Sequence, residues 1–229
     1  DAEIQEIGLK EGDTLLLNYQ DNPLATLEVE EIYSYDKDFM AQNVYGTTED
    51  KHPGVKRTRA YKDKFIGGKV TVVNPPTINP PFDKFWYPPR KLRESFSARG
   101  WKKVVAHQTR NVPHAGHEWL MKGAWFSANA DAILVNPVIG EKRTGDYIDE
   151  AIILTHDALR TAGYFREDIH MTSLLLWDMR YAGPREAVFH AIVRKNLGCT
   201  HHMFGRDHAG VGTYYDTYAA HRIFTQLPD

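Results

Sequence analysis

The 229-residue sequence has a single cysteine, Cys199, and no hydrophobic run long enough to span a bilayer. The lone thiol excludes an intrachain disulfide and a cysteine-based zinc site, and the longest apolar runs fall far short of the ~20 residues that a transmembrane helix needs. Basic charge is not in excess, because 28 Lys and Arg against 30 Asp and Glu give a formal charge of −2. No global field therefore favours DNA or anionic membranes. The acidic N-terminus lacks the features of a secretory signal, so we predict a water-soluble, cytoplasmic protein that binds anions only through a local site.

Composition and proline placement predict two domains. Apolar residues make up 42% of the sequence and charged residues 25%, which is typical of globular proteins. Six of the twelve prolines lie between residues 75 and 89, where regular helix or a central strand is not expected. We therefore predict a first domain over residues 1–74, a proline-rich linker over 75–98 and a second domain over 99–229.

The patterning of the two domains differs. Short runs over residues 13–19, 25–35 and 69–74 are rich in Leu, Val, Ile, Thr and Tyr, and predict a small antiparallel β structure. After the linker, predicted strands alternate with predicted helices. The strands are expected over residues 103–107, 132–135, 171–177 and 199–204, and the helices over 117–128, 146–163 with Asp146 as its N-cap, and 184–197. This alternation predicts an α/β fold with a parallel, doubly wound sheet and a ligand crevice at the carboxyl ends of its strands.

Ten of the eleven histidines follow residue 100, and two of them belong to the most specific motif, the segment from Gln108 to His117. It directly follows a predicted strand and opens a predicted helix. His114 and His117 would lie on one face of the first helical turn, where free backbone N–H groups and the helix dipole favour a phosphate. The alternative is a surface pair or half of a metal site. The strand-to-helix position and the adjacent Arg110 favour an anion site.

Two further motifs follow later predicted strands. Arg180 and Arg185 flank a tight turn in the segment from Met179 to Glu186 and are candidate anion-binding residues, although a plain helix start accounts for Pro184 equally well. The segment from Gly205 to Gly210 adds a cation, an anion and an imidazole. We expect the three strand ends to meet at one polyanion site that contains Arg110, His114, His117, Arg180, Arg185, Arg206 and His208. The sequence has no serine nucleophile elbow, Walker A loop or supported thiol–His pair, which favours direct in-line displacement at phosphorus.

In this order the three motifs resemble those of the ATP sulfurylases, or sulfate adenylyltransferases. The resemblance begins near Gly12 and extends to the C-terminus. One position departs from the common family form, which has proline directly after the asparagine, whereas this chain has Asn111-Val-Pro113 and keeps the spacing of both histidines. The resemblance implies a partial PUA-like β domain, then a Rossmann-like nucleotidyltransferase domain. The implied reaction is ATP + sulfate to adenosine 5′-phosphosulfate + pyrophosphate, by in-line attack of sulfate on the α-phosphate, with Mg²⁺.

The resemblance also implies roles for individual residues. The catalytic group would be Thr109, Arg110, Asn111, His114 and His117. Sulfate would be held by Gln108, Arg110 and the backbone at Ala209. The nucleotide would be held by Gln108, Arg110, Asn111, His114, His117, Gly205, Arg206, Asp207 and His208. No residue is expected to be a metal ligand, because Mg²⁺ enters with ATP.

Family members are longer at both ends, and the chain starts at Asp1 rather than Met, so we expect a fragment that lacks the start of the β domain and the C-terminal subdomain. The family implies a homo-oligomer, as a dimer, and a role in sulfate assimilation. One alternative is another H-x-G-H nucleotidyltransferase acting on a phosphorylated cofactor precursor. An RNA-binding protein with a PUA-like domain is the alternative from a different class, and the near-neutral charge argues against it.

Overall fold

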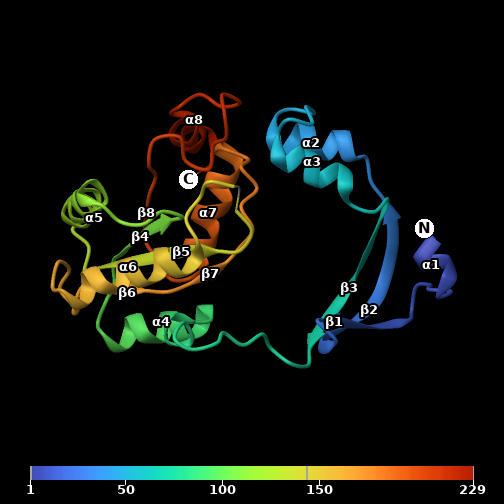
Figure 1. Ribbon diagram of the computed structural model, residues 1–229, viewed down its shortest axis with the longest axis horizontal. Coiled ribbons are helices and arrows are strands. Elements are labelled where there is room, and N and C mark those ends of the chain that lie inside the picture. Colours follow the sequence, from blue (N-terminus) through green and yellow to red (C-terminus); the bar gives the residue numbers. More distant parts are fainter. Residues whose placement is uncertain (1, 143, 229) are drawn as a thin grey trace. The chain divides into compact units, whose positions relative to one another are not determined.

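A computed structural model describes residues 2–142 and 144–228 of the chain (Figure 1). The chain divides into two compact units, Asp1–Asn79 and Pro80–Asp229. Among the described residues, no helix is both long enough and apolar enough to cross a membrane.

The first unit contains a three-stranded antiparallel sheet in the order β1-β2-β3. The strands are β1 (Thr14–Tyr19), β2 (Asn22–Ser34) and β3 (Lys64–Val72). Gln20 and Asp21, with φ of 48° and 64°, form the two-residue turn between β1 and β2, as the right-handed twist of a hairpin requires. Alternate residues of β2, namely Ala25, Leu27 and Val29, are buried. The predicted antiparallel β structure is confirmed.

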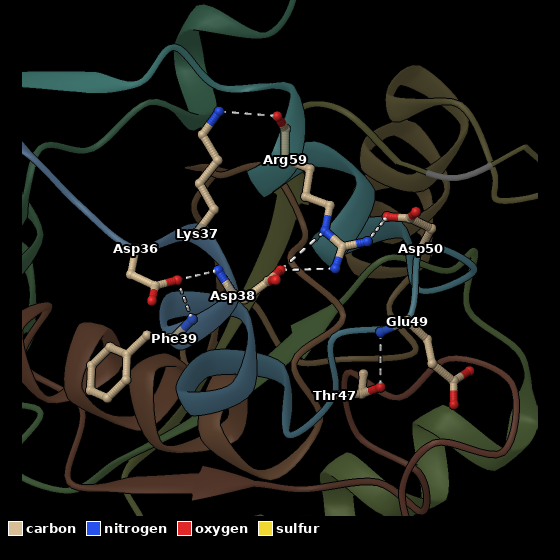
Figure 2. Close-up of polar contacts among 8 residues, drawn as sticks. All are labelled: Asp36, Lys37, Asp38, Phe39, Thr47, Glu49, Asp50 and Arg59. Atoms are coloured by element: carbon tan, nitrogen blue, oxygen red, sulfur yellow. Dashed lines mark hydrogen bonds and ion pairs between the residues drawn. The ribbon is translucent and has the colours of Figure 1, made fainter.

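Three helices of the first unit were not predicted: α1 (Ala2–Glu6), α2 (Lys37–Tyr45) and α3 (Pro53–Ala60). The Asp36 side chain caps α2 by accepting the N–H groups of Asp38 and Phe39, each at 2.9 Å. Figure 2 shows the Arg59 guanidinium between two carboxylates, 2.8 Å from Asp38 and 2.6 Å from Asp50. Side-chain pairing between α2 and α3 therefore joins the two helices.

The expected linker is wrong at its C-terminal end. After the 3-10 turn η1 (Asp83–Phe85), residues 89–98 form the helix α4 (Pro89–Ala98). Proline is favoured rather than excluded at the first helical position, because the N–H that it lacks has no partner within the helix there. Leu92 and Phe96 on α4 are buried in a cluster with Val104 and Ala106 of the following strand. The helix thus belongs to the second unit.

The second unit is built on the predicted parallel sheet, in the order β6-β5-β4-β8 with β7 beside β5. The strands are β4 (Val104–Thr109), β5 (Ala132–Ile139), β6 (His170–Thr172), β7 (Leu175–Leu176) and β8 (His201–Met203). The third predicted strand is split, since the N–H of Leu174 pairs outside the sheet with the Phe85 carbonyl at 2.9 Å. The chain order reverses between β4 and β8, which makes their carboxyl ends a topological switch point.

Helices cover both faces of this sheet (Figure 1): α5 (Ala115–Ser127), α6 (Asp149–Thr161) and α7 (Pro184–Asn196), while α8 (Ala219–Arg222) and η2 (Ile223–Gln226) end the chain. Successive residues of β4 point to opposite faces. Val104 packs in the cluster with α4 and Leu197, which follows α7. Val105 packs with Met121 of α5 in a second cluster, which Leu159 of α6 also contacts. The doubly wound arrangement is confirmed, and both cores hold β4 and its C-terminal loop in place.

Candidate functional site

A cavity of about 270 Å³ lies at the carboxyl ends of β4 and β8, at the switch point. It is lined by His107, Gln108, Thr109, Arg110, Asn111, His117, Leu120, Met179, Met203, Gly205, Arg206, Asp207, His208 and Ala209. The first and third predicted motifs therefore meet at one site. The second motif contributes Met179 to the lining.

The loop after β4 is fixed by its own side chains. The buried Thr109 hydroxyl accepts the N–H of Asn111 at 3.0 Å and donates to the Asn111 carbonyl at 3.1 Å, which closes the turn around Arg110. The Arg110 Nη1 atom donates to Asp146 at 3.3 Å, and the Arg110 guanidinium lies 5.4 Å from the centre of the Tyr181 ring. The site thus holds a guanidinium in a set orientation before any ligand arrives.

Asp146 has a different role from the predicted one. Ile148, not Asp146, occupies the N-cap position of α6, and no side chain caps that helix. Asp149 and Glu150 in its first turn already complement the helix dipole. Asp146 instead accepts hydrogen bonds from Arg110 and, at 3.2 Å, from the Tyr181 hydroxyl. The capping interpretation missed this contact of Asp146 with the candidate site residue Arg110.

His114 and His117 lie on one face of the first turn of α5, as predicted, with ring centroids 4.0 Å apart. His114 is the N-cap, and its Nδ1 atom accepts the N–H of Gly116 at 3.0 Å. A neutral His114 therefore has its proton on Nε2. A Cβ atom at position 116 would approach the His114 ring to 2.9 Å, which explains the glycine. Of the two imidazoles, His117 lines the cavity.

The cavity-lining His107 is one of a group of buried histidines. The ring of His107 is 5.7 Å from that of His117 and 6.2 Å from that of His156. Burial and neighbouring imidazoles lower the pKa of His107 to about 3, and burial lowers the pKa of His156 to about 4 and that of His170 to about 3. These side chains are neutral at physiological pH. The positive charge of the cavity lining comes from Arg110 and Arg206.

The loop from Gly205 to Gly210 contains two residues other than glycine in left-handed backbone conformations, Asp207 with φ of 53° and Ala209 with φ of 54°. Each costs roughly 1–2 kcal/mol, and such strain concentrates at functional sites. A Cβ atom at Gly210 would lie too close to Asp207 Oδ1, so a larger residue here would displace the Asp207 carboxylate. The Ala209 carbonyl accepts the N–H of Gly183 at 3.0 Å, which links the loop to the start of α7.

Arg180 and Arg185 are not among the described residues that line the cavity. The Arg180 guanidinium lies 5.4 Å from the Trp177 ring centre, and Arg185 is exposed in the first turn of α7. The buried charged residue of this motif is Glu186, which accepts hydrogen bonds from Trp177 Nε1 and from the N–H groups of Arg180 and Ala182. The segment thus supports the site from behind.

Comparisons with known proteins agree with this geometry. A family model described as ATP-sulfurylase matches residues 83–229, and one described as a PUA-like domain matches residues 1–75. The chain is 45% identical to the sulfate adenylyltransferase of Archaeoglobus fulgidus. The match includes 99% of this chain and 53% of that relative. The sulfate adenylyltransferase of Hyperthermus butylicus is 46% identical to 97% of the chain, which covers 56% of it.

The chain thus spans about half the length of the curated relatives it matches. Among solved structures, a hexameric APS kinase from Thiobacillus denitrificans matches 98% of this chain and 38% of its own with a TM-score of 0.69. At 20% identity, that match shows a shared fold.

Proposed function

Because the chain belongs to the ATP-sulfurylase family, we propose that its second unit supplies the site at which sulfate and ATP react to form adenosine 5′-phosphosulfate and pyrophosphate. The observation that carries this proposal is the cavity at the switch point, which the segments 107–111 and 205–209 line together. Both segments belong to the motifs that resemble those of the family.

The cavity chemistry suits two anions that repel each other. We assign sulfate to the Gln108 amide, the Arg110 guanidinium and the backbone at Ala209, and the nucleotide to the same β4 loop and to residues 205–208. An arginine fork offers five N–H donors in one plane and can contact oxygens of both anions at once. Because His107, His156 and His170 are neutral, Arg110 and Arg206 provide the attraction that offsets the repulsion between the two anions.

In the proposed step, a sulfate oxygen attacks the α-phosphorus in line with the pyrophosphate group. One phosphorus–oxygen bond forms to sulfate, and the bond to pyrophosphate breaks with its electron pair. Thr109, Arg110, Asn111, His114 and His117 are the proposed catalytic group. Their contribution is orientation and preorganised donors toward the developing charge, because phosphoryl-type transfers need little covalent chemistry from the protein.

The expected Mg²⁺ belongs to the substrate as its ATP complex. Within residues 2–142 and 144–228, no group of three or more His, Cys, Asp or Glu side chains could hold a metal ion. Mg²⁺ commonly uses phosphate oxygens, waters and one or two carboxylates. Mg²⁺ would therefore enter on the phosphate oxygens of ATP, and we assign none of the described residues to it as a ligand.

Calorimetric binding of adenosine 5′-phosphosulfate tests the shared site. This product occupies both subsites, so we expect it to bind more tightly than AMP, and we expect chlorate, a sulfate-like oxyanion, to compete with it. Equal affinities for the two nucleotides, with no competition by chlorate, would contradict a sulfate subsite and favour the H-x-G-H nucleotidyltransferase alternative. The dimer and the cytoplasmic location remain predictions, and light scattering of the purified protein tests the dimer.

A further inference from the structure

A chain of three side chains connects the interior of α7 to the cavity. The Glu186 Oε1 atom lies 3.4 Å from His190 Nε2, and His190 Nδ1 lies 3.0 Å from Nε2 of His208. Glu186 and His190 are one helical turn apart on α7 and are 3% and 0% exposed, whereas His208 lines the cavity. Through His208, the buried pair is therefore connected to the proposed nucleotide site.

The carboxylate end of this chain is fixed and charged. Glu186 accepts hydrogen bonds from Trp177 Nε1 and from the N–H groups of Arg180 and Ala182, at 2.9–3.1 Å. Burial by itself would raise the pKa of Glu186, but the nearby His190 ring and the hydrogen bonds from Arg180 and Trp177 outweigh it and lower that pKa. The chain therefore begins at an anion that can only accept hydrogen bonds.

An acceptor at one end determines the proton positions along the chain. His190 Nε2 has no hydrogen-bond partner among the described residues, and the polar atom it faces is the Glu186 carboxylate. A neutral His190 thus keeps its proton on Nε2, which leaves Nδ1 as an acceptor. His208 must then donate from Nε2, and its own Nδ1 is left as an acceptor.

His208 is also kept neutral. Burial, together with smaller contributions from the neighbouring His190 and Arg194, lowers its pKa to about 3. The ionisable groups around it are His190, Arg194 and Glu186 from α7, His202 from β8, and Arg110 and His107 from β4 and the loop after it. A neutral imidazole with a bare Nδ1 atom can accept a hydrogen bond but cannot donate one from that atom to a phosphate oxygen.

We propose that Glu186 and His190 are positioning residues that hold His208 as a neutral imidazole, with its proton on Nε2 and its Nδ1 atom accepting a hydrogen bond from an O–H or N–H group of the bound nucleoside. This inference rests on the proposed function, because it takes a nucleotide to be the ligand. It separates His208 from Arg110 and Arg206, which would contact the anionic part of the ligand.

Three substitutions of His190 dissect the chain. In His190→Asn, the amide oxygen takes the place of Nδ1 and still accepts the His208 proton. His190→Gln extends its amide toward the Nε2 position instead, facing Glu186, and His190→Leu removes both contacts. Outer partners that orient metal-bound histidines commonly contribute 10–100-fold in metal affinity or activity, and we take the same range for the partner of His208. We expect AMP to bind about 10–100-fold more weakly to the Gln and Leu variants and within about threefold of the parent for His190→Asn.

Pyrophosphate is the matched probe, since it is anionic and has no nucleoside donor. We expect its affinity to stay within about threefold in all three variants. Equal losses for AMP and pyrophosphate would overturn the proposal, because His208 would then act on phosphate or the substitution would have damaged the whole cavity. Melting temperatures identify any variant that fails to fold. If His190→Leu or His190→Gln does not fold, the His190→Asn variant still tests whether an acceptor at the Nδ1 position is sufficient.

Nitrogen NMR of the ligand-free chain tests the proton positions without any ligand. We expect His208 to show a protonated, exchange-protected Nε2 atom and an unprotonated Nδ1 atom, with the protection kept in His190→Asn and lost in His190→Leu. A proton on Nδ1 of His208 in the parent, or protection that persists in His190→Leu, would refute the proposed series of contacts from Glu186 through His190 to His208. If neither AMP nor pyrophosphate binds while the NMR pattern is as expected, the proposed function is refuted, but the contacts from Glu186 through His190 to His208 are supported.

Discussion

Arg110→Lys separates fixed geometry from simple charge at the proposed site. Arg110 has five N–H donors, and its Nη1 atom pairs with Asp146 at 3.3 Å, which leaves the remaining donors in one plane for the two anions. Lysine keeps the positive charge but has three donors on one nitrogen, so an ammonium paired with Asp146 cannot span sulfate and the α-phosphate. General attraction for sulfate should survive, while stabilisation of the developing charge should not.

Losing one preorganised donor typically costs ~2.7–4 kcal/mol, so we expect kcat to fall about 10²–10³-fold with little change in ATP affinity. The assay is sulfate-dependent turnover per folded molecule, measured together with melting temperature and the ATP dissociation constant. Arg185→Lys is the matched control, because Arg185 is exposed and does not line the cavity, and it should stay near the parent value. Near-normal turnover in a folded Arg110→Lys protein would remove Arg110 from the catalytic group.

Three other predictions concern the fold that holds the site. Leu92→Ala should lower the unfolding free energy measured by denaturant titration by about 2–5 kcal/mol, because Leu92 is fully buried. Leu154→Ala, at a position that is 45% exposed, should lower it far less. Equal losses would mean that α4 is not part of the core. Gly183→Ala should lower the melting temperature, since Gly183 has φ of 52° and a Cβ atom would lie 2.5 Å from the Tyr215 ring, and an unchanged value would contradict this packing. The free energy of unfolding should fall as the pH drops from about 6.5 toward 4, by roughly 1.4 kcal/mol per pH unit for each of His107, His156 and His170. The reason is that these histidines, with pKa values of about 3 to 4, stay unprotonated in the folded state and bind protons when the chain unfolds. Proton uptake near zero on unfolding at pH 5 would refute their neutrality.

Local patterns predicted those parts of the fold that local patterns determine. Alternating apolar runs placed β4, β5 and β8 and the helices between them, and motifs at strand ends placed Gln108 to Asn111 and Gly205 to Ala209 at one crevice. The helix α4 was missed because proline was taken as a helix breaker, although Pro89 stands where proline favours a helix start. The helices α2 and α3 were missed because tertiary pairing, such as that of Arg59 with Asp38, supports them.

The residues that act from behind the site have no local pattern. Asp146 lies 36 residues from Arg110, and His190 lies 18 residues from His208, so only the folded chain brings these pairs together. The clustering of histidines after residue 100 was the one indication, and it did not distinguish cavity residues from buried ones. Arg180 and Arg185 show the converse, because their motif identified a supporting turn whose buried charged residue is Glu186.

The exchange of labelled pyrophosphate into ATP tests the central claim most directly, since it requires the complete reaction to run in both directions. We expect the exchange to need sulfate. Because this chain spans 53% of the Archaeoglobus fulgidus relative, we also expect a lower rate than that relative shows under the same conditions. Exchange that proceeds equally well without sulfate would contradict the proposed reaction.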